Sequence, residues 1–214
     1  MTLSFDLFWS FRSPYSYLAT PRLVEMEREY DLSINVRPVY PLAVRQGDFF
    51  EKQNPLWIPY LLRDTMRIAE QLGLPYRWPR PDPVVVDPMT RAAVQNQPYI
   101  HRLTRLGCAA AEARRGLPFL LEVSTLIWSG RTDSWHEGTH LAAAAARAGL
   151  DLAELDARIA DPRYEDVIQE NQRAHQASGH WGVPTCAFEG EPFFGQDRLD
   201  ALLWRMQQRG LKRR

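Results

Sequence analysis

Residues 3–40, LSFDLFWSFRSPYSYLATPRLVEMEREYDLSINVRPVY, decide the fold of this chain. The stretch 3–9 is bulky, aromatic and apolar with a single acid, which predicts a buried strand. Ser13 suits a helix N-cap and Pro14 suits the first helical position, so a helix is predicted to begin there. A second strand is predicted at 32–40. A β-α-β unit of this kind normally has a right-handed crossover and two parallel strands.

Strand signals almost disappear in the middle of the chain and return near its C-terminal end. Residues 183–194, VPTCAFEGEPFF, predict two short strands around a tight hairpin at Glu189-Gly190-Glu191. A last helix is predicted after Asp197, which suits its N-cap. The helices predicted in the middle are 57–72, 89–115, 117–129, 136–148, 151–159 and 164–178.

The order β-α-β, helical block, β-β-α predicts an α/β, thioredoxin-like fold with a large all-helical insertion. We assign residues 1–44 and 179–214 to the thioredoxin-like domain and residues 45–178 to the inserted helical domain. A length of 214 residues suits one compact domain that carries an inserted lobe.

Composition excludes several classes of function. The 26 basic and 26 acidic side chains cancel, so no nucleic-acid partner is expected. Cys108 and Cys186 are far apart in sequence, which excludes a Cys-x-x-Cys pair, and they are too few for a zinc cluster or a disulfide framework. Both are expected to be small buried hydrophobes. We find neither a signal peptide nor a membrane-spanning run, and therefore expect a cytoplasmic protein with no membrane partner.

Three segments resemble one known family. They are FDLFWSFRSPYSYLA at 5–19, SGRTDSWHEGTHLAAAAARAGLD at 129–151 and WGVPTCAFEGEPFFGQDRLDALL at 181–203. The chain resembles the 2-hydroxychromene-2-carboxylate isomerase and kappa-class glutathione transferase family, in the DsbA-like branch of the thioredoxin superfamily. The resemblance covers essentially the whole chain. It implies a thioredoxin fold with a helical insertion, a homodimer, and glutathione as a cofactor bound at the N-terminus of the first helix.

Ser13 is the catalytic residue that the resemblance implies. Alone, Ser13-Pro14 indicates only a helix start. However, the free N–H groups and positive dipole end of a helix N-terminus also favour an anion, including a thiolate. By resemblance, Ser13 donates a hydrogen bond that activates the glutathione thiol. Ser13 and Ser16 also occupy the places where redox relatives have Cys-x-x-Cys, so disulfide exchange at this site lacks an attacking thiolate.

The resemblance assigns two further segments to glutathione. In the thioredoxin fold the proline matching Pro184 is cis and faces the first helix, and the backbone of Val183 is implied to pair with the cysteinyl unit as an added strand would. Gln196 and Asp197 resemble the segment that holds the γ-glutamyl end, where an acid pairs with the α-ammonium. This role of Asp197 is compatible with that of an N-cap.

Asn54 matches an asparagine that contacts glutathione in relatives. Those relatives commonly have a basic residue just after it or a few positions later, whereas this chain reads NPLWIPYLLRD from Asn54 onward, with Pro55 in the first of those places. Lys52 and Arg63 are the alternative anchors for the glycyl carboxylate.

Several aromatic residues are candidates to line a pocket for a flat, aromatic-derived substrate, and we assign Tyr15 and Trp57 to it. Such residues are also typical of a protein core. The full set is Trp9, Tyr15, Tyr17, Trp57 and Trp181.

The segment HEGTH, residues 136–140, matches the zinc-peptidase pattern H-E-x-x-H. We reject a metal site because the match lies in the first turns of a helix that Gly138 weakens, and no third ligand stands out. His175 and His180, near the end of the helical block, are expected on the surface.

The favoured function is that of a glutathione-dependent isomerase or a kappa-type transferase. The glutathione thiolate, stabilised by Ser13, would attack an electrophilic carbon of an aromatic-derived substrate. One alternative is a DsbA-like thiol-disulfide oxidoreductase, which the absence of Cys-x-x-Cys disfavours. A second alternative is a non-catalytic module that binds glutathione or another ligand.

Overall fold

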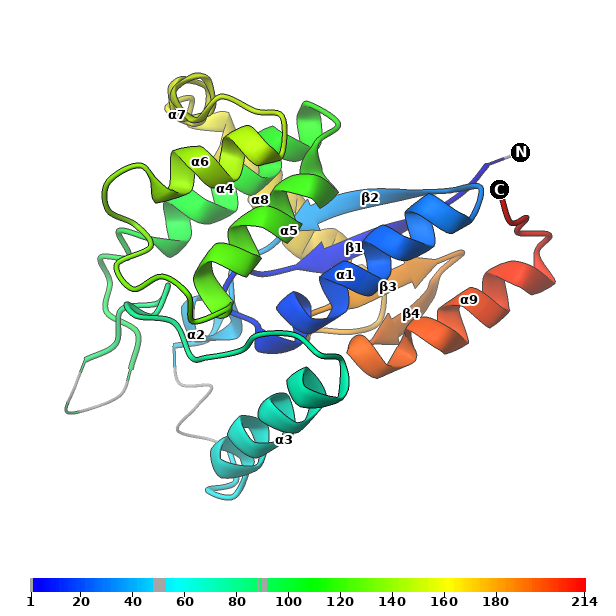
Figure 1. The fold of residues 1–214 in the computed structure, drawn as a ribbon, viewed down its shortest axis with the longest axis horizontal. Coiled ribbons are helices and arrows are strands. Elements are labelled where there is room, and N and C mark those ends of the chain that lie inside the picture. Colours follow the sequence, from blue (N-terminus) through cyan, green and yellow to red (C-terminus); the bar gives the residue numbers. More distant parts are fainter. Residues whose placement is uncertain (1, 48–52, 88, 90–91) are drawn as a thin grey trace.

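A four-stranded mixed sheet forms the centre of the molecule, for which the computed structural model describes residues 2–47, 53–87, 89 and 92–214 (Figure 1). The strand order is β2-β1-β3-β4; β1 pairs with β2 in parallel, and β3 is antiparallel to both β1 and β4. The two ends of the chain therefore share one sheet, as predicted. The strands are β1 (Leu3–Trp9), β2 (Leu32–Pro38), β3 (Thr185–Phe188) and β4 (Glu191–Phe194).

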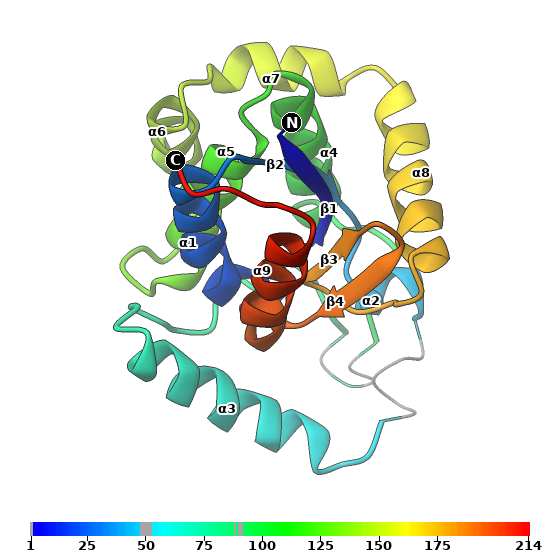
Figure 2. The same ribbon diagram turned by 90° about the vertical axis from the view of Figure 1, so that its right-hand side faces the viewer.

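Helices cover both faces of the sheet. Helices α1 and α9 lie on one side and α8 on the other, while α4 to α7 form a block beside β2 and α3 lies apart from that block (Figures 1 and 2). The elements are α1 (Pro14–Glu29), α2 (Leu42–Arg45), α3 (Trp57–Gln71), α4 (Ile100–Glu112), α5 (Gly116–Trp128), α6 (His140–Arg147), α7 (Leu152–Ile159), α8 (Arg163–Ala177), the 3-10 helix η1 (Gln196–Arg198) and α9 (Leu199–Gln208).

Local sequence chemistry explains the two elements that frame the site. The Ser13 side chain accepts a hydrogen bond from the Ser16 amide at 3.1 Å, so it caps α1, and Pro14 follows as the first helical residue. The β3–β4 hairpin turns through Glu189 and Gly190, both of which have a positive φ. That pair of conformations matches the twist of a two-residue hairpin, and glycine adopts it without strain.

Two of the predicted helices are shorter than expected. The prediction of helix over 89–115 is wrong for residues 92–99, because α4 begins only at Ile100; residues 90 and 91 lie outside the described part of the chain. The buried Gln97 side chain hydrogen-bonds the backbone of Val85 at 2.8 and 2.9 Å and the Val94 carbonyl at 2.7 Å, which ties this segment into a loop. Pro98 also disfavours a helical conformation at the residue before it.

The second shortened helix is the one predicted over 136–148, since α6 starts at His140. Gly138 has a φ of 56°, a left-handed conformation that a helix does not contain. The H-E-x-x-H residues therefore do not share a helical face, as a zinc site of that type requires. The short helix α2 was not predicted at all.

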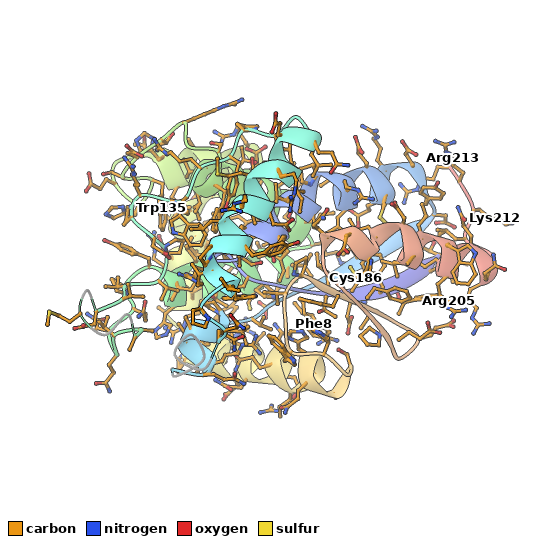
Figure 3. All side chains as sticks on the ribbon, turned by 90° about the horizontal axis from the view of Figure 1, so that it is seen from below. Phe8, Trp135, Cys186, Arg205, Lys212 and Arg213 are labelled. Atoms are coloured by element: carbon orange, nitrogen blue, oxygen red, sulfur yellow. The ribbon has the colours of Figure 1, made fainter. Side chains whose placement is uncertain are left out.

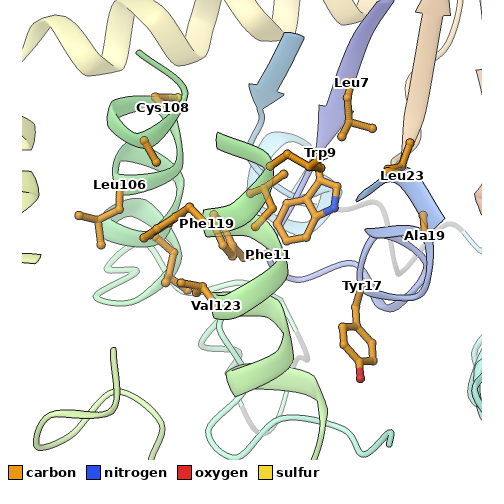
Figure 4. Packing of buried hydrophobic residues seen from close by; sticks show 14 of the residues in the cluster. Leu7, Trp9, Phe11, Tyr17, Ala19, Leu23, Leu106, Cys108, Phe119 and Val123 are labelled. Atoms are coloured by element: carbon orange, nitrogen blue, oxygen red, sulfur yellow. The ribbon is translucent and has the colours of Figure 1, made fainter. Parts of the chain in front are cut away.

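One hydrophobic core joins the sheet to the inserted helices. Trp9 and Leu18, from β1 and α1, belong to the same buried cluster as Phe119 and Val123 from α5 (Figure 4). Phe11 bridges the two sets, with its ring edge-on to Trp9 at 4.7 Å and to Phe119 at 6.2 Å. The boundaries at residues 45 and 178 therefore divide the sequence, but one hydrophobic core extends across both of them.

Three basic side chains gather at the end of the molecule where the chain ends (Figure 3). Phe8 and Cys186 lie inside the sheet region, and the buried Trp135 lies far from Arg205, Lys212 and Arg213, which gather near the C-terminus (Figure 3). Cys108 and Cys186 are free and buried, as expected. Burial raises the pKa of the Cys108 thiol to about 12 and also raises the pKa of Cys186.

His175 is fully buried, so the expectation that it lies on the surface is wrong. Its ring stacks on Phe8 of β1 at a centroid distance of 4.6 Å. Neither ring nitrogen has a hydrogen-bond partner among the described residues. Burial lowers the pKa of His175 to about 4, and the charge of Arg45 lowers it further. The imidazole is therefore neutral at physiological pH.

This buried histidine predicts a pH dependence of stability. Between pH 6.5 and about 4 the unfolded chain binds a proton at residue 175 that the folded chain does not bind. The free energy of unfolding is therefore expected to fall as pH drops through this window, by up to about 1.4 kcal/mol per pH unit. Urea titrations at several pH values measure it. His175→Phe retains the stack on Phe8 and should reduce the slope of the free energy of unfolding against pH in this window.

His140→Phe is the matched control, since the His140 side chain is exposed. It is expected to leave the slope in place. Equal slopes for His175→Phe and the unsubstituted protein would contradict the assignment to residue 175.

Candidate active site

A cleft of about 1180 Å³ opens at the N-terminal end of α1. It brings together Ser13, Tyr15, Trp57 and Val183 of the predicted site, together with the turn after β4 that contains Gln196 and Asp197. The described walls come from residues 12–15, 41–43, seven positions between 57 and 68 on α3, Trp78, Asp82, Val86, residues 181–183 and residues 194–197.

The Ser13 side chain links the first turn of α1 to the segment that precedes β3. Its Oγ accepts the Ser16 amide hydrogen and donates to the carbonyl oxygen of Val183 at 3.2 Å. The residue is half-buried, so its hydroxyl lies at the wall of the cleft and not in the core. A hydroxyl at this position can release the Val183 carbonyl and donate to an anion at the helix N-terminus.

The Val183-Pro184 bond is cis, as the resemblance implies. Pro184 itself is buried and does not line the cleft, whereas Gly182 and Val183 do. The guanidinium of Arg45, on α2, donates to the carbonyls of Tyr40 at 2.8 Å and Trp181 at 2.9 Å. This holds the backbone that leads into the cis bond against α2.

Sulfur is absent from the described walls of the cleft. Cys108 and Cys186 both lie in the core, and Ser16, which the resemblance places at the second cysteine position of redox relatives, is buried outside the cleft. The Ser16 Oγ has no hydrogen-bond partner among the described residues. A thiolate at the Ser13 hydroxyl must therefore arrive with a bound molecule.

Tyr15 and Asp64 link α1 to α3 across the cleft. The Tyr15 hydroxyl donates to the Asp64 carboxylate at 2.8 Å, and Arg67 donates to the same carboxylate at 2.5 Å. Partial burial, together with the hydrogen bond to Asp64, raises the pKa of Tyr15. Tyr15 therefore remains protonated and acts as a hydrogen-bond donor, not as a base.

Among the cleft residues that the sequence did not reveal, three form an interacting group: Arg12, Trp78 and Asp82. Arg12 donates two hydrogen bonds to the Asp82 carboxylate, at 3.1 and 3.2 Å, and its guanidinium lies 5.4 Å from the centre of the Trp78 ring. Trp78 also donates to Asp82, at 3.1 Å. No motif signals this group, because it assembles residues from separate parts of the chain.

Exposed aromatic rings line part of the cleft. Trp181 is 51% exposed and Phe194 is 41% exposed, and His180 stacks on Phe194 at 4.0 Å. Trp57 also lines the cleft. By contrast, Trp9 is fully buried and Tyr17 is 2% exposed, so both belong to the core.

Asp197 lines the cleft but does not cap a helix. It lies inside η1, and the N-cap of α9 is Arg198, which makes no side-chain capping bond. The prediction of an Asp197 N-cap is therefore wrong, because a 3-10 turn precedes the helix. The Asp197 carboxylate pairs with Arg198 at 3.0 Å and is exposed.

The structure does not bring Asn54 into the cleft. Its side chain is exposed and accepts the Leu56 amide hydrogen at 2.9 Å, which stabilises the turn before α3. Arg63 is exposed and is not a lining residue, and Lys52 lies outside the described residues. Among the described lining residues, Arg12 is the basic one.

Neither a metal-ligand cluster nor a membrane-spanning helix occurs in the part of the chain that the structure describes. It contains no group of three or more His, Cys, Asp or Glu side chains that could hold a metal ion. It also contains no helix with the length and hydropathy needed to cross a bilayer.

The sheet order, the cis proline opposite the N-terminus of α1 and the inserted helices define a protein of the thioredoxin class. The chain belongs to the family of the DSBA-like thioredoxin domain, whose model matches residues 5–207. The fold class and family expected from the sequence are thus confirmed.

Proteins that this chain is similar to include enzymes of different kinds. The chain is 24% identical over 209 residues to the 2-hydroxychromene-2-carboxylate isomerase of Sphingobium xenophagum, covering 94% of this chain and 97% of that protein. Among solved structures, a 2-hydroxychromene-2-carboxylate isomerase is similar with a TM-score of 0.70 and 20% identity, covering 96% of this chain and 95% of that one. The cytosolic disulfide reductase DsbM from Pseudomonas aeruginosa, in its structure with GSH, has a TM-score of 0.58 and 18% identity over 96% and 100% of the two chains.

Proposed function

We propose that the protein is a glutathione-dependent enzyme of the 2-hydroxychromene-2-carboxylate isomerase or kappa-type transferase kind, acting on an aromatic-derived electrophile. The observation that carries the proposal is the contact between the Ser13 hydroxyl and the Val183 carbonyl, at the N-terminus of α1 and on the wall of a large cleft. The isomerase relative, which aligns along nearly the whole chain, also supports it.

The residues present fit glutathione. The Ser13 hydroxyl and the α1 N-terminus would hold the sulfur, the backbone at Val183 would pair with the cysteinyl unit, and the Asp197 carboxylate would bind the α-ammonium. Glutathione supplies a nucleophilic thiolate when bound. The exposed rings of Trp181 and Phe194 and the apolar side of α3 would hold a flat substrate close to that sulfur and limit access of water.

The comparison with redox relatives favours this function over disulfide exchange. The disulfide reductase DsbM has a similar fold, but this chain has serines at positions 13 and 16, and both of its thiols are buried with raised pKa values. A buried, protonated thiol is a poor attacking group. We therefore expect no activity in an insulin reduction assay. The homodimer and the cytoplasmic location stay predictions.

Calorimetry with glutathione tests the proposal. We expect binding at millimolar ligand or below, and we expect S-methylglutathione to bind more weakly because its thioether cannot form a thiolate at the α1 N-terminus. Absence of heat at millimolar glutathione would contradict the proposed function.

A further inference from the structure

The turn between β4 and α9 needs support from outside itself. Gly195 has a φ of 101°, and a Cβ added there would lie 2.6 Å from the Asp197 carboxylate. The 3-10 residues that follow are not buried, and neither η1 nor α9 begins with a side-chain cap. Backbone bonds link Gly195 to the Pro184 carbonyl at 2.9 Å and Arg198 to the Gly195 carbonyl at 3.3 Å.

Arg22, on α1, supplies that support. One guanidinium nitrogen donates to the carbonyl of Gln196 at 2.9 Å, and another donates to the Asp200 carboxylate at 2.7 Å. The planar guanidinium of Arg22 thus joins the 3-10 turn to the first turn of α9. The Asp200 side chain is 86% exposed, so the ion pair itself adds little stability. The bond to the Gln196 carbonyl is therefore the important contact for the site.

Arg22 and Ser13 belong to the same helix, and this fixes their separation. Arg22 lies about two and a half turns, or roughly 13 Å, along the axis from Ser13. One rigid element therefore places the hydroxyl at the sulfur end of the cleft and also holds the turn that carries Asp197 at its other side. A ligand that contacts both the Ser13 hydroxyl and the Asp197 turn must have a length that matches the distance between them.

We infer that Arg22 is a positioning residue for the γ-glutamyl end of glutathione, acting through the Gln196 carbonyl. This inference rests on the proposed function. Arg22 holds the Gln196-Asp197 turn at the spacing that an intact γ-glutamyl group needs, and it thereby makes the protein prefer glutathione to cysteinylglycine, which lacks that group. The sulfur and its contact with Ser13 are the same in both ligands.

The test compares the dissociation constants of glutathione and cysteinylglycine by calorimetry. We expect Arg22→Met to weaken glutathione binding about tenfold, the usual cost of a charge-assisted hydrogen bond, while cysteinylglycine binding changes less than about twofold. Arg22→Lys keeps the charge but lacks the planar guanidinium. Its affinity for glutathione should therefore lie between those of the unsubstituted protein and Arg22→Met. Hydrogen exchange of the amides at 195–200 should be faster in Arg22→Met.

Arg28→Met is the matched control, because Arg28 is also on α1 and its side chain is 69% exposed. It should leave both affinities and the amide exchange unchanged. Equal weakening of both ligands by Arg22→Met, or an unchanged preference for glutathione, would overturn the inference. Failure of the unsubstituted protein to bind glutathione would instead contradict the proposed function.

Discussion

Replacing Ser13 by alanine is expected to lower kcat/KM of the glutathione-dependent reaction by about 100-fold, the usual cost of removing one donor aimed at a developing or full negative charge. The hydroxyl lies at the α1 N-terminus and already donates to a carbonyl in the cleft, so it can donate to a bound sulfur. Without it the pKa of the bound thiol should rise. The ultraviolet absorbance of the thiolate, followed against pH in the complex, measures that shift.

Ser16→Ala is the matched control for this substitution. The Ser16 hydroxyl is buried, lies outside the cleft and lacks a hydrogen-bond partner among the described residues. Its removal should therefore leave both kcat/KM and the thiol pKa unchanged.

Ser13→Ala also removes a helix cap, which costs about 1 kcal/mol of stability. Ser13→Asp separates the two effects, because aspartate caps a helix as well as serine does but repels a thiolate. We expect Ser13→Asp to keep the helix cap and to lack activity, although its carboxylate cannot donate to the Val183 carbonyl as the serine hydroxyl does. An unchanged pKa of the bound glutathione thiol in Ser13→Ala would contradict the role assigned to Ser13.

Replacing Trp128 by alanine is expected to lower the free energy of unfolding by about 3–5 kcal/mol. Trp128 ends α5, is fully buried, and donates to the Phe11 carbonyl at 2.9 Å, just before Ser13 in the chain. Its ring stacks parallel to Tyr76 and edge-on to Trp78. The truncation leaves a large cavity and an unpaired carbonyl between the sheet and the inserted helices.

Urea denaturation of Trp128→Ala measures this loss, with Trp204→Ala as the control. Trp204 is 54% exposed on α9, so the same substitution there should cost less than about 1 kcal/mol. Because one core joins the two parts of the molecule, we expect Trp128→Ala to destabilise both together. A loss confined to one of two separate transitions would contradict this and would indicate that residues 45–178 unfold as an independent unit.

Elements with strong local signals were predictable from the sequence. Ser13-Pro14 marks the start of α1, because the cap and the first helical residue are chosen by contacts within one turn. The same holds for the Glu189-Gly190 hairpin, where the backbone conformation depends on the turn residues themselves. The absence of a Cys-x-x-Cys pair was visible without a structure.

Other features exist only after the chain has folded. Arg12 and Asp82, and likewise Arg22 and Gln196, are distant in sequence and meet because the sheet and α1 bring their segments together. No periodicity or spacing signals such pairs. The residues on either side of His175 in the sequence are mostly polar and suggest an exposed helix, yet its ring is buried against Phe8.

The sequence by itself thus determined the fold class, the start of α1 and the absence of a dithiol, because each depends on pattern or on nearest neighbours along the chain. The tertiary structure decided which side chains share the cleft and which are buried. It brought Tyr15 and Trp57 to the cleft, left Trp9 in the core, and turned Asp197 from a helix cap into a residue of a 3-10 turn. Those outcomes depend on contacts between segments far apart in the chain, and local residue patterns do not specify them.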